Sequence, residues 1–204
     1  MTIVLIHAFP VDPRMWERQL EVVPDAVTPR LYGRGTDLVD WARQILEEVE
    51  GELVIAGASM GGYVALQMAR LAPERVRGIA LVGSRAAADS PERRRFRDEL
   101  IERYRAGERH SQASPEVTTE ELIEAQTAIR DRPDATDVVR AFEGPFLVCV
   151  GDSDEVVSVE DARAVAELAP TGRLEIFEGA GHLLSLEQPE RFNRVLETFA
   201  SQWG

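Results

Sequence analysis

The chain has 204 residues, of which 44% are hydrophobic and 29% are charged. This length fits one domain, and the composition is that of a globular protein, which excludes disorder, a collagen-like repeat and a disulfide scaffold. The 36 acidic and 23 basic residues give a net charge of −13, which argues against nucleic acid or an anionic membrane as a partner.

The residues available for cofactor and metal chemistry are few. All 23 basic residues are arginines, which excludes a Schiff-base lysine and the lysine of a nucleotide-binding P-loop. The single Cys149 lies in an apolar run and indicates core packing, and none of the three histidines has the spacing of a zinc motif. We therefore expect no cofactor and no metal. The N-terminus shows neither a signal-peptide pattern nor a long apolar span, so we expect a cytoplasmic protein.

Short apolar runs of strand length alternate with helical patterns along the chain. After the first run, Asp12 and Pro13 are expected to begin a helix. A weak strand is expected over 26–32, at a sheet edge because it contains Pro29. Thr36 is then expected to cap a further helix. A last helix carries an apolar stripe from Phe192 to Trp203. The alternation predicts an α/β fold with an open, mostly parallel sheet of about six strands and helices on both faces. The central strands are expected over 3–6, 53–56, 76–82, 146–150 and 174–177.

Residues 85–142 interrupt this alternation. They carry no strand pattern, and three helical segments open near Ser90, Ser114 and Asp134. We interpret this stretch as a small helical cap inserted after the fourth strand, between the two core segments 1–84 and 143–204. The alternative is that these helices pack on the sheet as ordinary crossovers.

A candidate nucleophile comes directly after the strand at 53–56. The sequence Gly57-Ala58-Ser59-Met60-Gly61-Gly62 leads into an apolar helix over 63–71. A serine on so sharp a strand-to-helix turn has a strained backbone, and flanking glycines are needed where a Cβ atom would strike the neighbouring elements. The alternative is a glycine-rich turn with an incidental serine.

With this turn, the chain resembles the α/β-hydrolase superfamily. After the first strand, His7-Ala8-Phe9-Pro10 is similar to the H-G-x-P turn of that family, with alanine in place of the usual glycine. The resemblance implies that the backbone N–H groups of Phe9 and Met60 form the oxyanion hole. We expect His7 to tie this loop by hydrogen bonding rather than to take part in catalysis.

Two further turns fall in the order of the same family. Gly151-Asp152-Ser153-Asp154 resembles its G-x-x-D turn, which implies that Asp154 is the acid, with Asp152 and Glu155 as competitors and a merely solvated acidic turn as the alternative. Gly179-Ala180-Gly181-His182 resembles its G-x-G-H loop, which makes His182 the base. Along the chain, Ser59, Asp154 and His182 follow the order of serine, acid and histidine that is typical of the α/β-hydrolase fold. His110 is interpreted as a surface residue.

The resemblance covers essentially the whole chain but begins at the third strand of the family, so the two usual leading strands are missing. It implies attack by Ser59 on an acyl carbon and hydrolysis of an acyl-enzyme without a cofactor. The similarity is to the branch with small carboxylesterases and 3-oxoadipate enol-lactonase-like proteins, which favours esters or lactones of small substrates.

Several alternatives stay open at this point. The same triad serves cofactor-free perhydrolases or haloperoxidases, carbon–carbon hydrolases and non-enzymatic ligand receptors, and the fold does not decide among them. The run Arg93-Arg94-Arg95-Phe96-Arg97 is expected to be a solvated helix face, with recognition of a substrate carboxylate as the alternative. Phe96 and Tyr104 are expected to pack in the core rather than line a pocket.

Overall fold

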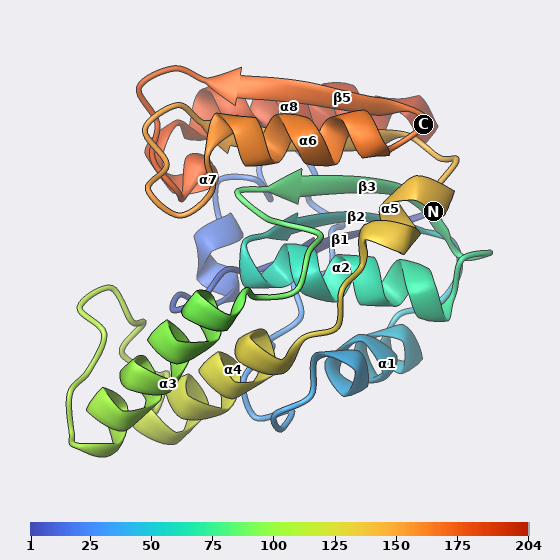
Figure 1. The fold of residues 1–204 in the computed structure, drawn as a ribbon. Helices are drawn as coiled ribbons and strands as arrows, with labels where there is room; N and C mark the ends of the chain where they lie inside the picture. The colour runs from blue at the N-terminus through green and yellow to red at the C-terminus, as the bar shows by residue number, and fades with distance from the viewer. Residues whose placement is uncertain (204) are drawn as a thin grey trace.

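A parallel sheet forms the centre of the protein, whose computed structural model describes residues 1–203. Its five strands lie in the order of the chain, and each pairs with its neighbour in parallel (Figure 1). This arrangement confirms the predicted α/β fold class. The strands are β1 (Thr2–Ile6), β2 (Leu53–Ala58), β3 (Val76–Val82), β4 (Phe146–Gly151) and β5 (Gly172–Phe177).

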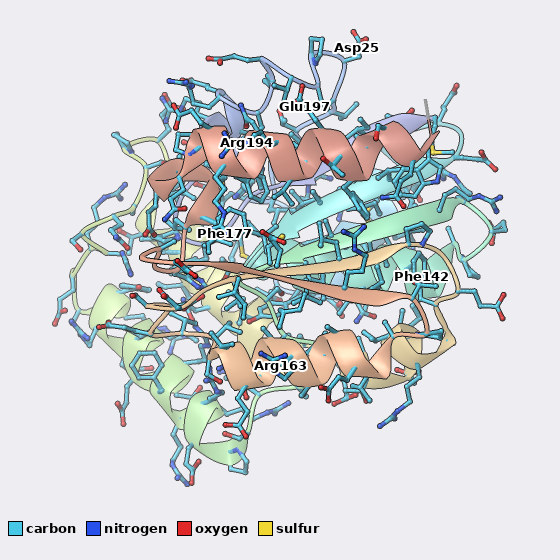
Figure 2. All side chains as sticks on the ribbon, turned by 90° about the horizontal axis from the view of Figure 1, so that it is seen from above. Asp25, Phe142, Arg163, Phe177, Arg194 and Glu197 are labelled. Atoms are coloured by element: carbon cyan, nitrogen blue, oxygen red, sulfur yellow. The ribbon has the colours of Figure 1, made fainter. Side chains whose placement is uncertain are left out.

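Helices cover both faces of the sheet, and each face has its own apolar cluster. On one face, α1 (Leu38–Glu48), α2 (Met60–Leu71) and α6 (Val159–Leu168) bury side chains such as Trp41 and Val64. On the other face, α8 (Pro189–Ala200) packs Phe192 against Trp16 of the short 3₁₀ helix η1 (Pro13–Trp16), with their rings 6.0 Å apart. Figure 2 shows these layers with α8, which carries Arg194, and α6, which carries Arg163, on opposite sides of β5. The buried Cys149 packs in the second cluster, as the sequence predicts.

The weak strand expected over 26–32 is reduced to one parallel bridge between Val4 and Val27. The N–H of Leu5 donates to the carbonyl of Val27, and Val27 donates back to Ile3. Further along, Pro29 has no N–H to donate, and the N–H of Leu31 donates instead to the His7 side chain. The ladder therefore stops after one bridge, and the described sheet has five strands rather than about six.

Three helices lie between β3 and β4, as the interruption at 85–142 predicts. Helices α3 (Pro91–Arg105) and α4 (Thr119–Asp131) pack against each other and project from one end of the sheet in Figure 1. The third, α5 (Thr136–Ala141), instead contacts α2 and α6. The division into a core and a separate cap stays a prediction.

Side-chain caps fix where two of these helices begin. Ser90 accepts a hydrogen bond from the N–H of Arg93, and Thr118 forms a reciprocal capping box with Glu121. The helix expected from Ser114 therefore begins later, at Thr119, since the N–H of Val117 bonds back to Ser114 in a turn. The chain ends with α7 (Leu184–Glu187), α8 and the 3₁₀ helix η2 (Ser201–Trp203). No helix within residues 1–203 has the length and apolar character needed to cross a membrane.

The beginning of α1 corrects one expected cap and gives a test. Asp37, not Thr36, accepts hydrogen bonds from the N–H groups of Val39 and Asp40. Asp37→Ala should lower the free energy of unfolding by about 1 kcal/mol, measured by urea denaturation. Thr36→Ala is the control at the neighbouring exposed position and should change it by less than about 0.5 kcal/mol. If Thr36→Ala lowered the free energy of unfolding more than Asp37→Ala does, the assignment of Asp37 as the capping residue would be wrong.

Candidate active site

Ser59 sits on the turn between β2 and α2 in a strained backbone conformation. Its φ is 48° and its ψ −108°, and it is the one residue other than glycine with a positive φ in residues 1–203. Neighbouring groups hold the turn: the N–H of Ser59 donates to Val82 at 2.8 Å, while its carbonyl accepts from the Ser84 hydroxyl at 2.8 Å and from the Gly62 N–H at 3.0 Å. Such strain persists only where the surroundings impose it, and it is common at functional sites.

The glycines of this turn are required by close approaches of other backbone. A Cβ atom at Gly57 would strike the carbonyl group of Gly61, and one at Gly61 would strike the carbonyl group of Ile6 at the end of β1. A Cβ atom at Gly62 would strike the side chain of Ser84. The structure therefore explains the G-x-S-x-G pattern as the sequence predicts, because α2 begins in direct contact with the ends of the strands.

The three side chains predicted as a triad lie in one hydrogen-bonded row. The distance from Ser59 Oγ to His182 Nε2 is 2.9 Å, and the distance from His182 Nδ1 to Asp154 Oδ2 is 2.8 Å. The Asp154 side chain is fully buried, whereas 20% of the His182 side chain is exposed. With its Nδ1–H donated to the carboxylate, the imidazole presents Nε2 as an acceptor for the serine hydroxyl.

Asp154 is held as a carboxylate by its surroundings. Its Oδ1 accepts the N–H groups of Val156 at 2.7 Å and Val157 at 2.9 Å. Burial acts to raise the pKa of Asp154, but the hydrogen bond and charge of His182, together with these two N–H groups, outweigh it and lower the pKa. Neither competitor is hydrogen-bonded to His182: Asp152 accepts from the N–H of Gly179 at 2.8 Å, and Glu155 is exposed.

Gly83 is a site residue that the sequence patterns did not single out. It lies just after β3 with a φ of +54°, and a Cβ atom there would lie 3.2 Å from His182 Nδ1 and 3.3 Å from Asp154 Oδ2. Any larger residue would therefore crowd Asp154 and His182. A glycine at the end of a strand is the only signal that the sequence offers for it.

His7 fixes the loop after β1 from inside the protein. Its Nε2 accepts the N–H of Leu31 at 3.0 Å, and its Nδ1 donates to the carbonyl of Ala8 at 3.0 Å. Burial lowers the pKa of His7 to about 4; backbone hydrogen bonds and the charge of Asp12 oppose this shift more weakly, whereas the charge of Arg30 adds to it. His7 is thus a neutral structural residue, as predicted. Phe9, two residues on, lines the same cavity as Ser59, and Met60 begins α2, whose first N–H groups have no partner within the helix.

A cavity of about 350 Å³ opens beside Ser59 and His182. Helices α3 and α4 provide part of its wall, through residues such as Leu100 and Ile129. A larger hollow of about 530 Å³, between β5 and α8, contains no triad residue. Volume alone therefore does not locate the site. Residues 1–203 contain no group of three or more His, Cys, Asp or Glu side chains arranged to hold a metal ion.

The cavity wall corrects several expectations from the sequence. His110 is not a plain surface residue, since it lines the cavity with its ring 5.7 Å from that of Phe9, and burial, followed by the charge of Arg103, lowers its pKa. Phe96 lines the cavity, whereas Tyr104 is buried as expected. Arg93 and Arg97 also line the cavity, so the arginine run is not simply a solvated face.

Comparison with known proteins identifies the family of the chain. Residues 3–195 match the alpha/beta hydrolase family, so the chain belongs to that family. A pimeloyl-(acyl-carrier protein) methyl ester esterase of Aromatoleum aromaticum is 33% identical over 91 residues, which make up 40% of this chain but only 36% of that protein. One from Photobacterium profundum is 27% identical over 239 residues, with 97% of this chain and 93% of that protein covered. A thermophilic esterase from Thermogutta terrifontis superposes with a TM-score of 0.86 at 29% identity, covering 99% of this chain and 90% of that one.

The depressed pKa of His7 predicts how stability depends on pH. An unfolded histidine takes up a proton near its ordinary pKa of 6.5, whereas folded His7 does so only near 4. Its contribution is therefore fully present above pH 6.5 and is lost as the pH falls toward 4, by about 3 kcal/mol in total. In His7→Gln the loss of unfolding free energy between pH 7 and 4.5 should be smaller than in the wild type by about 2–3 kcal/mol, measured by urea denaturation. If the unfolding free energies of the wild type and His7→Gln changed with pH in parallel, His7 would not be the source of this pH dependence.

Proposed function

We propose that this protein is a serine hydrolase that cleaves carboxylic esters or lactones of small substrates through an acyl-enzyme on Ser59. The observation that carries the proposal is the row from Ser59 through His182 to the buried Asp154, with distances of 2.9 and 2.8 Å, at the wall of a cavity. The family and the esterases among the similar proteins favour the same class of reaction.

Each of these residues would take one role in the first half of the reaction. His182 Nε2 removes the hydroxyl proton while Ser59 Oγ attacks the carbonyl carbon, and Asp154 stabilises the imidazolium that forms. The N–H groups of Phe9 and Met60 donate to the oxyanion of the tetrahedral intermediate. His182 then gives its proton to the leaving alkoxide, the bond between carbon and this oxygen breaks, and the acyl group stays on Ser59.

The second half of the reaction repeats these steps with water. His182 removes a proton from a water molecule, whose oxygen attacks the acyl carbon, and the same oxyanion hole holds the second intermediate. The proton returns to Ser59 Oγ as the acid product leaves. A cavity of about 350 Å³ has room for a small acyl compound.

The expected cytoplasmic location stays a prediction.

The role of the nucleophile has a direct test. Ser59→Ala should lower the rate of p-nitrophenyl ester hydrolysis by roughly 10⁴-fold or more, measured as p-nitrophenolate release over acetate to decanoate. Ser201→Ala, at an exposed position of η2, is the matched control and should keep the wild-type rate. The absence of turnover by the folded wild type would refute the proposal and direct the search to diketone cleavage or ligand binding.

The role of the acid is tested by two neighbouring aspartates. Asp154→Asn keeps the shape of the side chain but favours the wrong imidazole tautomer, so it should lower the rate by roughly 10⁴-fold. Asp152→Asn should lower it by less than about threefold, because Asp152 bonds the N–H of Gly179 and not His182. The same p-nitrophenyl assay measures both, and the opposite order would assign the acid to Asp152.

A further inference from the structure

Two arginines of α3 reach the wall of the catalytic cavity in a chain whose net charge is −13. One of them is already neutralised. Arg97 donates from Nε to Oδ2 of Asp89 at 3.2 Å and from Nη1 to Oε1 of Gln126 at 3.1 Å. The Asp89 side chain is fully buried and also lies 2.8 Å from Arg132. The charge of Arg97 is therefore matched inside the protein.

Arg93 differs because it has no carboxylate partner among residues 1–203. The one hydrogen bond of its guanidinium there is to the carbonyl of Val156, at 3.4 Å. Arg93 is partly buried, and this burial, together with the charge of Arg85, lowers its pKa while the side chain stays protonated. A partly desolvated cation without a counter-ion is unfavourable, so an anion that enters the cavity would be stabilised there.

The other arginines near Arg93 are paired with carboxylates. Arg85 is paired with Asp161 at 2.7 Å, and neither residue lines the cavity. The one carboxylate of the cavity wall, that of Glu155, is exposed to solvent, which screens its charge. Arg97 and Arg132 share the buried Asp89, and the buried Asp154 is hydrogen-bonded to His182. Arg93 is therefore the arginine of the cavity wall that no carboxylate within residues 1–203 pairs with.

Gln126 of α4 supplies a second, independent sign of a ligand. Its side chain is buried in the cavity wall, and its Oε1 accepts from Arg97, which identifies Nε2 as the donor end of the amide. This Nε2 has no acceptor within residues 1–203. A buried donor without an acceptor destabilises a protein, so such a group calls for an acceptor oxygen.

We infer that Arg93 and Gln126 form a carboxylate-binding subsite in the catalytic cavity, and that the preferred substrates are esters or lactones whose acyl part carries a second, ionised carboxylate. The flat guanidinium matches the two oxygens of a carboxylate, and the amide provides a further donor. The inference rests on the proposed function, because it names the substrate class of the same site.

The test compares substrates that differ only in charge. The monomethyl esters of the dicarboxylic acids from succinate to suberate are each paired with the neutral analogue in which the free carboxylate is a primary amide. Methanol release gives kcat/KM for each compound. The wild type should favour the acid over the amide by about tenfold or more at the chain length that spans the cavity, and added salt should lower this ratio. A ratio near one at every length overturns the inference.

Variants then assign the preference to residues. Arg93→Gln and Gln126→Glu should each lower the acid-to-amide ratio by about tenfold or more, the second because it places a negative charge in the subsite. Arg93→Lys should keep part of the preference. The control is Arg95→Gln, an exposed position of the same helix outside the cavity wall, which should keep the wild-type ratio. An unchanged ratio in folded Arg93→Gln also overturns the inference.

The hydrolysis of p-nitrophenyl acetate separates this inference from the proposed function. If that activity is present and depends on Ser59 while the acid-to-amide ratio is one, only the subsite is refuted. If the folded wild type hydrolyses no ester, the proposed function is refuted, and calorimetry with adipate monoamide decides the subsite. Binding that is lost in Arg93→Gln supports the subsite, and absent or equal binding overturns it.

Discussion

The contact between the start of α2 and the end of β1 is the constraint on which the site depends. No side-chain atom fits between Gly61 and the carbonyl group of Ile6, so the helix begins directly against the sheet. Beside this contact, Ser59 turns with a φ of 48°, and its Oγ lies 2.9 Å from His182 Nε2. The same contact brings the loop after β1, with Phe9, beside the helix N-terminus, where unpaired N–H groups favour negative charge. The proposed nucleophile and the proposed oxyanion donors thus depend on the same backbone packing.

The second requirement is to keep a charged acid away from water without losing its charge. Two backbone N–H groups and the imidazole occupy the oxygens of Asp154, and Gly83 leaves the room that this pair needs. Such a carboxylate orients the histidine without being neutralised itself.

An arginine satisfies several backbone groups in another part of the protein: Arg75 donates to the carbonyls of Leu46, Val49 and Gly51. Its several donors fix the chain between α1 and β2, which a lysine with one ammonium group would do less well.

The sequence predicted most reliably the features that the backbone determines. Apolar runs located all five strands, and the turn around Ser59 could be recognised because its glycines have no substitute there. Features that depend on distant contacts were harder to predict. The residues near Pro29 have the pattern of a short strand, but the N–H of Leu31 bonds to the distant His7 instead of a neighbouring strand. Thr36 and Asp37 are both favourable capping residues, and the choice between them depends on where the helix begins. His110 and Arg93 looked like surface residues because nothing local shows which side of a helix or loop faces a cavity.

In the proposed mechanism, the residues that react and the residues that select the substrate lie on different elements. Ser59, Asp154 and His182 come after three strands of one rigid sheet, so their distances are set by strand pairing and change little with the surrounding sequence. The wall opposite them comes from α3 and α4, which pack mainly on each other and project from the sheet. Substitutions of the cavity-lining residues on these two helices should therefore alter the size and charge of the cavity without displacing Ser59, Asp154 and His182. A fold built in this way can change its substrate while it keeps its chemistry, and the charges along α3 and α4 are where the preference of this protein should be sought.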